Sequence, residues 1–169
     1  MALSALRHLC IDPSVVACLT QTSLRRFVTG TMALELPDRS GFAEGWHLEL
    51  VLNSRRGVTR NGDDGVDTCR YLSDEGVDDR HDDAHPFTTD ITGPCWMASH
   101  ARAYADVVLR DIFLFGHARA RSLTADIDRA ETATTARTLL EHAMPQLPTT
   151  SRVPLSAWLN APSKGVSID

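Results

Sequence analysis

Residues 94–115 read PCWMASHARAYADVVLRDIFLF, the most regular stretch of this chain. Its apolar residues recur every three or four positions, which is the spacing of one face of an α-helix. These residues are Met97, Ala101, Tyr104, Val108, Ile112 and Phe115. Thr92 is a predicted N-cap, Pro94 suits the first helical position, and Gly116 is predicted to end the helix. The sequence therefore predicts one long helix from Pro94 to Phe115.

Two further features of this stretch bear on its surroundings. Arg102, Asp106 and Arg110 are spaced four apart, so opposite charges can pair along one side of the helix. Several large apolar residues lie outside the main stripe, namely Trp96, Val107, Leu109, Phe113 and Leu114. A helix that is apolar around so much of its circumference is either enclosed by its own domain or part of an interface.

Length and composition are those of an ordinary globular protein. The 169 residues are 43% hydrophobic and 23% charged, which predicts one domain over residues 1–160 and a frayed tail over 161–169. No apolar run approaches the roughly eighteen residues of a membrane span, and Arg7, His8 and Asp12 interrupt the opening segment. We therefore expect a cytoplasmic protein, in the producing cell or a host, that does not enter a membrane.

The four cysteines are scattered without the C-x-x-C spacing of metal or redox sites. They are Cys10, Cys18, Cys69 and Cys95. Free thiols are expected, because no secretion signal places the chain in an oxidising compartment.

Around the central stretch, the sequence predicts an α+β fold: a small antiparallel sheet packed against the long central helix and a second C-terminal helix. Residues 32–36 and 46–53 alternate between apolar and other side chains, which is typical of a hairpin with one buried face. Short helices are expected over residues 2–10 and after Asp12-Pro13.

The C-terminal part should contain one more helix and a short docking segment. A helix is predicted from about Thr124 to Met144, with Pro145 ending it. The following PQLPTTSRVP is interpreted as a linker, and Trp158 and Leu159 are expected to dock on the domain from a short turn of helix.

The net acidity of the chain is concentrated in one segment. Residues 61–90 contain ten acidic residues and two arginines, whereas the rest of the chain is slightly basic. The segment is rich in turn-forming residues, with one short strand predicted between Val66 and Leu72, and we expect it to be exposed and loosely ordered. Its charge favours a cation, a basic partner or simple solvation.

The strongest catalytic hypothesis is a partial zinc motif. His47 and Glu49 followed by Pro94-Cys95 resemble part of the H-x-E and P-C-x-x-C pattern of zinc-dependent deaminases. However, Ala98 stands where that pattern requires its second cysteine, and His100 would point away from Cys95 on a helix. A catalytic zinc site lacks its third ligand in this reading.

A second metal hypothesis concerns the acidic segment. His81 and His85 are four residues apart and lie among aspartates, a ligand set that suits zinc or another transition metal. The segment lacks helical apolar support, and a solvated loop is the preferred interpretation. Zinc is therefore expected only under the alternative of a small metal-dependent hydrolase or deaminase-like enzyme.

Nucleic-acid binding is a third alternative. Arg25-Arg26 and Arg55-Arg56 could contribute to a basic face of the N-terminal part, but no clustered aromatic residues accompany them. The chain also lacks phosphate-binding glycine motifs and nucleophile motifs.

The preferred functional expectation is a non-enzymatic protein-interaction factor: an adaptor, chaperone, inhibitor or immunity-type protein without a cofactor. It would act through the apolar helix and the acidic segment on another protein, such as one with a basic surface, and homodimerisation through the helix is an alternative. The residues predicted to bind the partner are Asp74, Glu75, Asp78, Asp79, Asp82, Asp83, Trp96 and Phe113.

Overall fold

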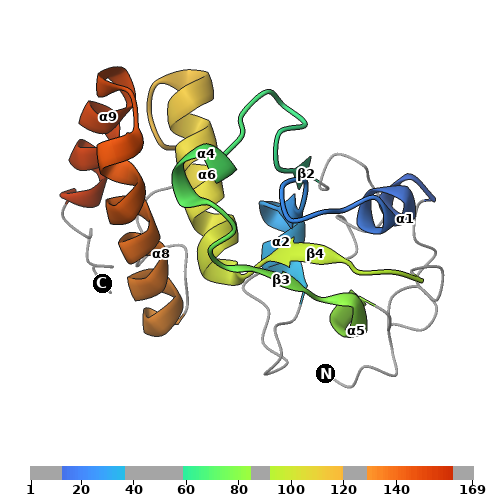
Figure 1. Ribbon diagram of the computed structural model, residues 1–169. Helices are drawn as coiled ribbons and strands as arrows, with labels where there is room; N and C mark the ends of the chain where they lie inside the picture. Colours follow the sequence, from blue (N-terminus) through green and yellow to red (C-terminus); the bar gives the residue numbers. More distant parts are fainter. Residues whose placement is uncertain (1–12, 37–58, 85–91, 120–128, 162–169) are drawn as a thin grey trace, which may run out of the picture.

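The structure is a computed structural model, which describes residues 13–36, 59–84, 92–119 and 129–161. These residues form short strands and helices around one long helix, α6 (Figure 1). In chain order the elements are α1 (Pro13–Thr20), β1 (Val28–Thr29), α2 (Thr31–Glu35), β2 (Thr59–Arg60), α4 (Cys69–Leu72), β3 (Val77–Asp79), α5 (His81–Ala84), β4 (Trp96–Ala98), α6 (His100–Phe115), α8 (Ala130–Ala143), the 3₁₀ helix η3 (Met144–Gln146) and α9 (Thr149–Leu159).

The strands form a small mixed sheet in the order β2-β1-β4-β3. The outer pairs, β1 with β2 and β3 with β4, are antiparallel, whereas the central strands β1 and β4 are parallel, with Val28 opposite Met97. The predicted α+β class, with a small sheet beside a central helix and a C-terminal helix, is confirmed. The sheet is not antiparallel throughout, because its two central strands run in the same direction.

Helix α6 begins later than its sequence predicts. Ser99 is the N-cap and its hydroxyl accepts a hydrogen bond from the Arg102 amide at 3.3 Å. The expected start at Thr92 and Pro94 is wrong, because Trp96–Ala98 pairs with strands on both sides as β4. The predicted end is confirmed: Gly116 is left-handed, with φ 76°, and its amide donates to the Ile112 carbonyl.

Two apolar clusters lie along α6. The first joins α6 to α8 and α9 and includes the fully buried Leu109, Leu139 and Leu140. The second joins the sheet, α2 and the start of α6, and Phe27 and Met97 are fully buried in it. Figure 1 shows α8 and α9 on one side of α6 and the sheet on the other. Most of the helix circumference is therefore covered by its own chain.

The apolar alternation at 32–36 does not form a strand. Thr31–Glu35 is helix α2, which follows Gly30 at φ 66°. Met32, Ala33 and Leu36 are buried, and burial of residues spaced one and four apart fits a helical face and not alternation. The other half of the predicted hairpin, 46–53, and the predicted helix 2–10 lie outside the described residues. Helix α1 begins at Pro13, as predicted.

The C-terminal region contains more helix than expected. Helix α8 falls within the predicted range, although the predicted start at Thr124 lies outside the described residues. The predicted linker is wrong, since η3 and most of α9 occupy it and Pro154 lies inside α9. Buried Leu155 and Leu159 hold α9 on the first cluster, and Trp158 packs 6.4 Å from the Tyr104 ring, so the predicted docking is confirmed.

The predicted pairing of Arg102 with Asp106 is confirmed, but both side chains are completely buried. The Arg102 Nε donates to the Asp106 carboxylate at 2.9 Å, and the Thr29 hydroxyl donates to its other oxygen at 2.6 Å. The Arg102 guanidinium also donates to the Glu75 carbonyl and lies 5.0 Å from the centroid of the Phe27 ring. One ion pair therefore links α6 to β1 and to the chain entering β3.

In the parts of the chain that the structure describes, no helix combines the length and the apolar character needed to cross a membrane.

Candidate functional site

One surface depression lies between α4 and the C-terminal end of α6. This aromatic hollow has a volume of about 350 Å³ and is lined by Asp64, Gly65, Val66, Asp67, Arg70, Tyr71, Phe113 and Leu114. The rings of Tyr71 and Phe113 stack at 5.3 Å between centroids. Leu114 is 47% exposed, and Phe115 beside it is 49% exposed. Apolar side chains at a hollow with a charged rim are characteristic of a binding surface.

The wall of the hollow formed by residues 64–67 is held by a buried amide. The Asn61 side chain donates to the Arg25 carbonyl and to Asp67 Oδ1, both at 2.8 Å, and accepts from the Thr68 amide and hydroxyl. Arg110 of α6 then binds Asp64, with Nε 2.6 Å from Oδ2. Arg110 therefore pairs with this loop and not with Asp106, and it ties the wall to the helix.

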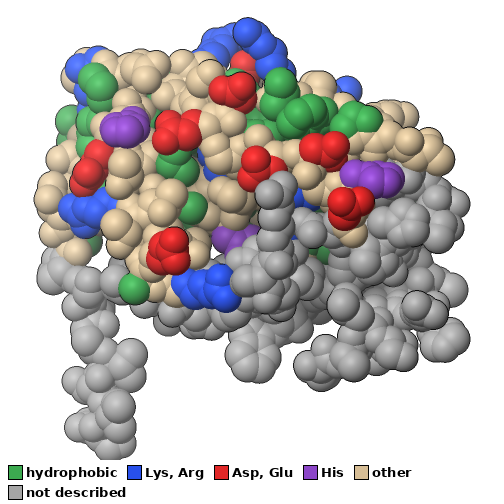
Figure 2. Space-filling view, turned by 60° about the horizontal axis from the view of Figure 1, so that its bottom comes forward, with side chains coloured by type: hydrophobic (Ala, Val, Ile, Leu, Met, Phe, Trp, Pro, Cys, Tyr) green, Lys and Arg blue, Asp and Glu red, His purple; other side chains and the backbone are tan. Residues whose placement is uncertain are grey.

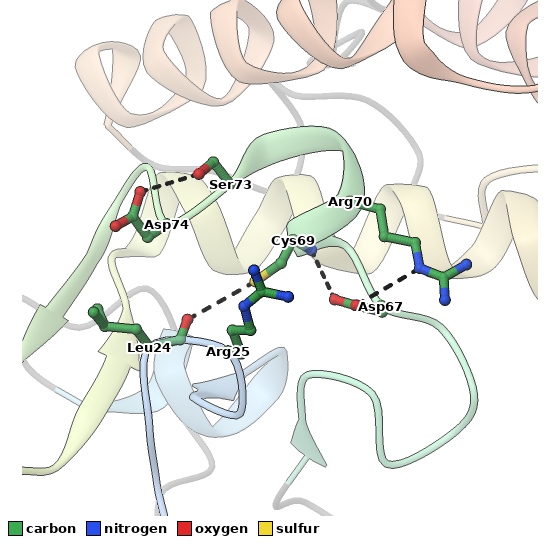
Figure 3. Close-up of a pocket in the computed structure, with 7 residues that line it drawn as sticks. All are labelled: Leu24, Arg25, Asp67, Cys69, Arg70, Ser73 and Asp74. Carbon is green, nitrogen blue, oxygen red and sulfur yellow. Dashed lines mark hydrogen bonds and ion pairs between the residues drawn. The ribbon is translucent and has the colours of Figure 1, made fainter.

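A second depression lies on the other side of α4 (Figure 3). This thiol hollow has a volume of about 340 Å³ and is lined by Leu24, Arg25, Asp67, Cys69, Arg70, Ser73 and Asp74. Figure 3 shows Ser73 and Asp74 on one side, Asp67 and Arg70 on the other, and Arg25 between them. Because both hollows are lined by Asp67 and Arg70, this ion pair separates them.

Most of the predicted acidic residues are exposed on the surface. Within residues 61–84, α4, β3 and α5 replace the expected irregular loop, and Val66 to Leu72 contains a helical turn where a strand was predicted. The exposed carboxylates that follow α4 form what we call the acidic strip: Asp74, Glu75, Asp78, Asp79 and Asp82. Figure 2 shows acidic side chains spread across the face presented there, with hydrophobic side chains beside them. The Asp83 side chain and residues 85–90 lie outside the described part.

The two apolar residues predicted to bind a partner are not brought together. Phe113 lies in the aromatic hollow, near the end of α6. Trp96 lies in β4, before α6 begins, and packs half-buried against the second apolar cluster. With 1.5 Å of rise per residue, Phe113 is about 20 Å along α6 from its start. Only Phe113 belongs to the candidate site.

The described residues do not bring together a set of metal ligands for either metal hypothesis. His47, Glu49 and His85 lie outside them, and no group of three or more potential ligands occurs among the rest. His100 Nε2 lies 2.9 Å from the Leu36 carbonyl oxygen. Cys95 is completely buried before β4, where its own amide donates to the Asp79 carboxylate. Cys95 and His100 are therefore placed in structural contacts, and His81 lies in α5, where it lines a depression with Asp79 and Asp82.

The basic residues near the N-terminus are partly engaged with acidic ones. Arg26 binds Asp63 at 2.8 Å, and Asp63 also accepts from Arg60. Residues 55 and 56 lie outside the described residues. In the described part of the predicted basic face, the Asp63 carboxylate thus offsets some of the positive charge that would bind nucleic acid.

The environments of Cys95 and Cys69 lead to a prediction about thiol chemistry. Burial, together with the nearby Asp79 carboxylate, raises the pKa of Cys95 to about 11. Cys69 is only half-buried; burial raises its pKa too, but the Arg102 guanidinium opposes the rise. Because the thiolate is the reactive form, we expect iodoacetamide at pH 8 to alkylate Cys69 at least about tenfold faster than Cys95.

Timed alkylation of the native protein followed by peptide mass spectrometry measures both rates. Alkylation in denaturant is the control, since there the two rates should converge. Faster native modification of Cys95 than of Cys69 would contradict the buried position of Cys95 and would reopen its role as a ligand.

Sequence reasoning missed the residues that complete the hollow with Phe113. Tyr71, Asp67 and Leu114 were not among the predicted site residues, and Tyr71 was assigned to a strand. No local pattern links residues 64–71 to the end of α6, so only their packing identifies the site.

No protein-family model, curated protein or solved structure matches this chain.

Proposed function

We propose that this protein is a non-enzymatic interaction factor, of the adaptor, chaperone, inhibitor or immunity type, that acts in the cytoplasm of the producing cell or a host. Its partner is another protein, which docks in the aromatic hollow and carries positive charge toward the acidic strip. The observation that carries this proposal is the stacked Tyr71–Phe113 pair beside the exposed Leu114.

The composition of the hollow supports this role. Aromatic side chains that are partly buried before binding lose little conformational freedom on binding and offer large contact areas. Tyr71 and Phe113 already pack against the first apolar cluster, and the ion pair between Arg110 and Asp64 fixes the opposite wall. A preorganised hollow of this kind reduces the entropy lost when a partner docks.

The charge of residues 61–84, whose first part forms one wall of the hollow, supports a basic partner. Residues 61–84 contain nine acidic residues and two arginines, of which Arg80 is buried. Complementary charge accelerates encounter and selects among partners more than it adds affinity. Binding should therefore weaken as salt increases, because the exposed charges of the strip are screened within about 10 Å at 0.1 M salt.

Site-specific photo-cross-linking tests the proposal. We expect a photoreactive benzoylphenylalanine at position 114 to form one discrete adduct with another protein in the producing cell. The same group at Val153, which is 68% exposed on α9, is the matched control and should form none. Replacing Asp74, Glu75 and Asp78 with their amides should reduce the adduct formed from position 114 several-fold.

Two results would contradict this function. Equal, diffuse labelling from positions 114 and 153 would show that the hollow is not a preferred binding surface. An adduct with twice the mass of the chain would replace the proposed heterologous partner with a homodimer.

A further inference from the structure

We infer that the aromatic hollow takes an arginine side chain of the partner, whose guanidinium binds Asp67 while its methylene stem packs on Tyr71, Phe113 and Leu114. This inference rests on the proposed function and specifies the chemistry of its anchor. It follows from three features that line the same depression. These are the fixed Asp67 carboxylate, the loosely paired Arg70 guanidinium and an apolar wall.

The Asp67 carboxylate is held in place by one of its oxygens. Oδ1 accepts from the Asn61 side-chain amide at 2.8 Å and from the Cys69 backbone amide at 3.0 Å. These donors orient the group without neutralising its charge. The orientation therefore exists before any ligand arrives, and no ordering of this side chain opposes binding.

Among the described residues, the other oxygen of Asp67 has only a loose partner. Arg70 Nε lies 3.7 Å from Oδ2, and the Arg70 side chain is 75% exposed. A solvent-exposed pair at this separation contributes little, since desolvation is small and the long side chain keeps its freedom. A guanidinium that enters the hollow can thus replace Arg70 beside Oδ2 at small cost.

The walls of the hollow suit the rest of an arginine side chain. Val66, Tyr71, Phe113 and Leu114 offer apolar surface next to the carboxylate. Arginine combines an apolar stem with a planar, weakly hydrated cation that binds carboxylates and aromatic rings. The same kind of contact already exists within the chain, where Arg110 of α6 binds Asp64 on this rim.

Other anchors fit these surroundings less well. An acidic side chain would be repelled by Asp64 and Asp67, the two carboxylates that line the hollow. A purely apolar side chain would fill the hollow but would remove water from Asp67 Oδ2 without replacing its hydrogen bonds, which is unfavourable. Charge complementarity with residues 61–84 therefore favours a cationic anchor.

Nuclear magnetic resonance titration with three blocked tripeptides tests this inference. The probes are acetyl-Gly-Arg-Gly-amide, its citrulline analogue, which has nearly the same shape without the charge, and its norleucine analogue. We expect the arginine peptide to shift backbone amide signals of residues 64–71 and 113–115. It should bind about five- to tenfold more tightly than the citrulline peptide, as expected for a hydrogen bond between charged groups.

Matched variants assign the binding to Asp67. Asp67→Asn keeps the Oδ1 hydrogen bonds and should weaken the arginine peptide about fivefold, because it removes the charge beside the guanidinium. Glu131→Gln, the same chemical change at an exposed position of α8, should have no effect. Arg70→Gln should strengthen binding about twofold, because it removes the weakly paired competing cation.

The outcomes separate this inference from the function on which it rests. Arginine and citrulline peptides that bind equally, or an Asp67→Asn protein that binds arginine unchanged, would overturn the arginine anchor. Preferential binding of norleucine would overturn it as well, while leaving an interaction site with an apolar anchor. Absence of binding by all three peptides, together with an adduct from position 114, would refute the anchor alone, whereas absence of both would refute both.

Discussion

Arg102→Met is expected to lower the free energy of unfolding by about 3–5 kcal/mol, the range for removing one partner of a buried ion pair. Both side chains of the pair are completely buried, so among the described side chains Asp106 would keep only the Thr29 hydroxyl as a hydrogen-bond donor. The substitution would also remove the guanidinium donors to three backbone carbonyls at the end of α4, those of Leu72, Ser73 and Glu75. A loss of this size is a large share of the ~5–15 kcal/mol that stabilises a typical domain.

Urea unfolding followed by circular dichroism measures this loss. Arg137→Met is the matched control, because Arg137 and Glu141 have the same four-residue spacing on α8 but are 47% and 51% exposed. Its effect should stay below about 1 kcal/mol. The double change Arg102→Met with Asp106→Leu should recover much of the loss, since no buried charge remains. Equal effects of Arg102→Met and Arg137→Met would refute the importance of the buried pair.

Gly76→Ala is expected to destabilise the protein by about 2–4 kcal/mol, through backbone strain together with overpacking. Gly76 has φ 72°, and an added Cβ would lie 2.9 Å from the Cβ of Arg102 and 3.1 Å from the hydroxyl oxygen of Ser99. Its carbonyl also accepts from the Ser99 amide at 2.7 Å. The chain entering β3 therefore rests directly on the start of α6, and Arg102 cannot move aside without breaking its own contacts.

Gly62→Ala separates the two contributions to this effect. Gly62 has φ 86°, and nothing lies within 4 Å of its added Cβ, so only the conformational cost of about 1–2 kcal/mol applies. Thermal unfolding of the two variants side by side gives the comparison. If Gly76→Ala proves no more destabilising than Gly62→Ala, the close approach to α6 does not constrain the fold.

Both predictions concern the support of the candidate site. The carbonyls that Arg102 binds follow directly on Tyr71 and Arg70, which line the aromatic hollow. Disturbing the buried pair should therefore loosen α4 as well as destabilise the domain. Variants that test binding should be made at Asp67 or Arg70, where the side chains are exposed enough to change without loss of the core.

The candidate site was only partly predictable. The acidic residues of β3 and α5 could be identified because charge density is a property of sequence alone, and Phe113 because it lies off the main apolar stripe. Asp67 and Tyr71 could not, since their role depends on α4 lying against the far end of α6. The thiol hollow likewise combines residues 24 and 25 with residues 67–74, which no periodicity relates.

Some errors about the fold share one physical cause. The strand β4, three residues long, and α2, five residues long, are too short for their own propensities to select a conformation. Trp96–Ala98 is extended because β1 and β3 pair with it on both sides. Pro154 is kept within α9 although proline disfavours a helix interior, because Leu155 and Leu159 are buried against the first cluster.

By itself the sequence determined the body of α6 and its end at Gly116, because a long 3.6-residue period and a left-handed glycine are local properties. It also determined that Arg102 and Asp106 would lie within reach of each other, since four residues bring two side chains to one face. Only the tertiary structure decided that this pair would be buried, when β1, α4 and β3 enclosed it. Burial depends on segments distant in the chain, and it turns an ordinary surface spacing into the contact that holds the candidate site in place.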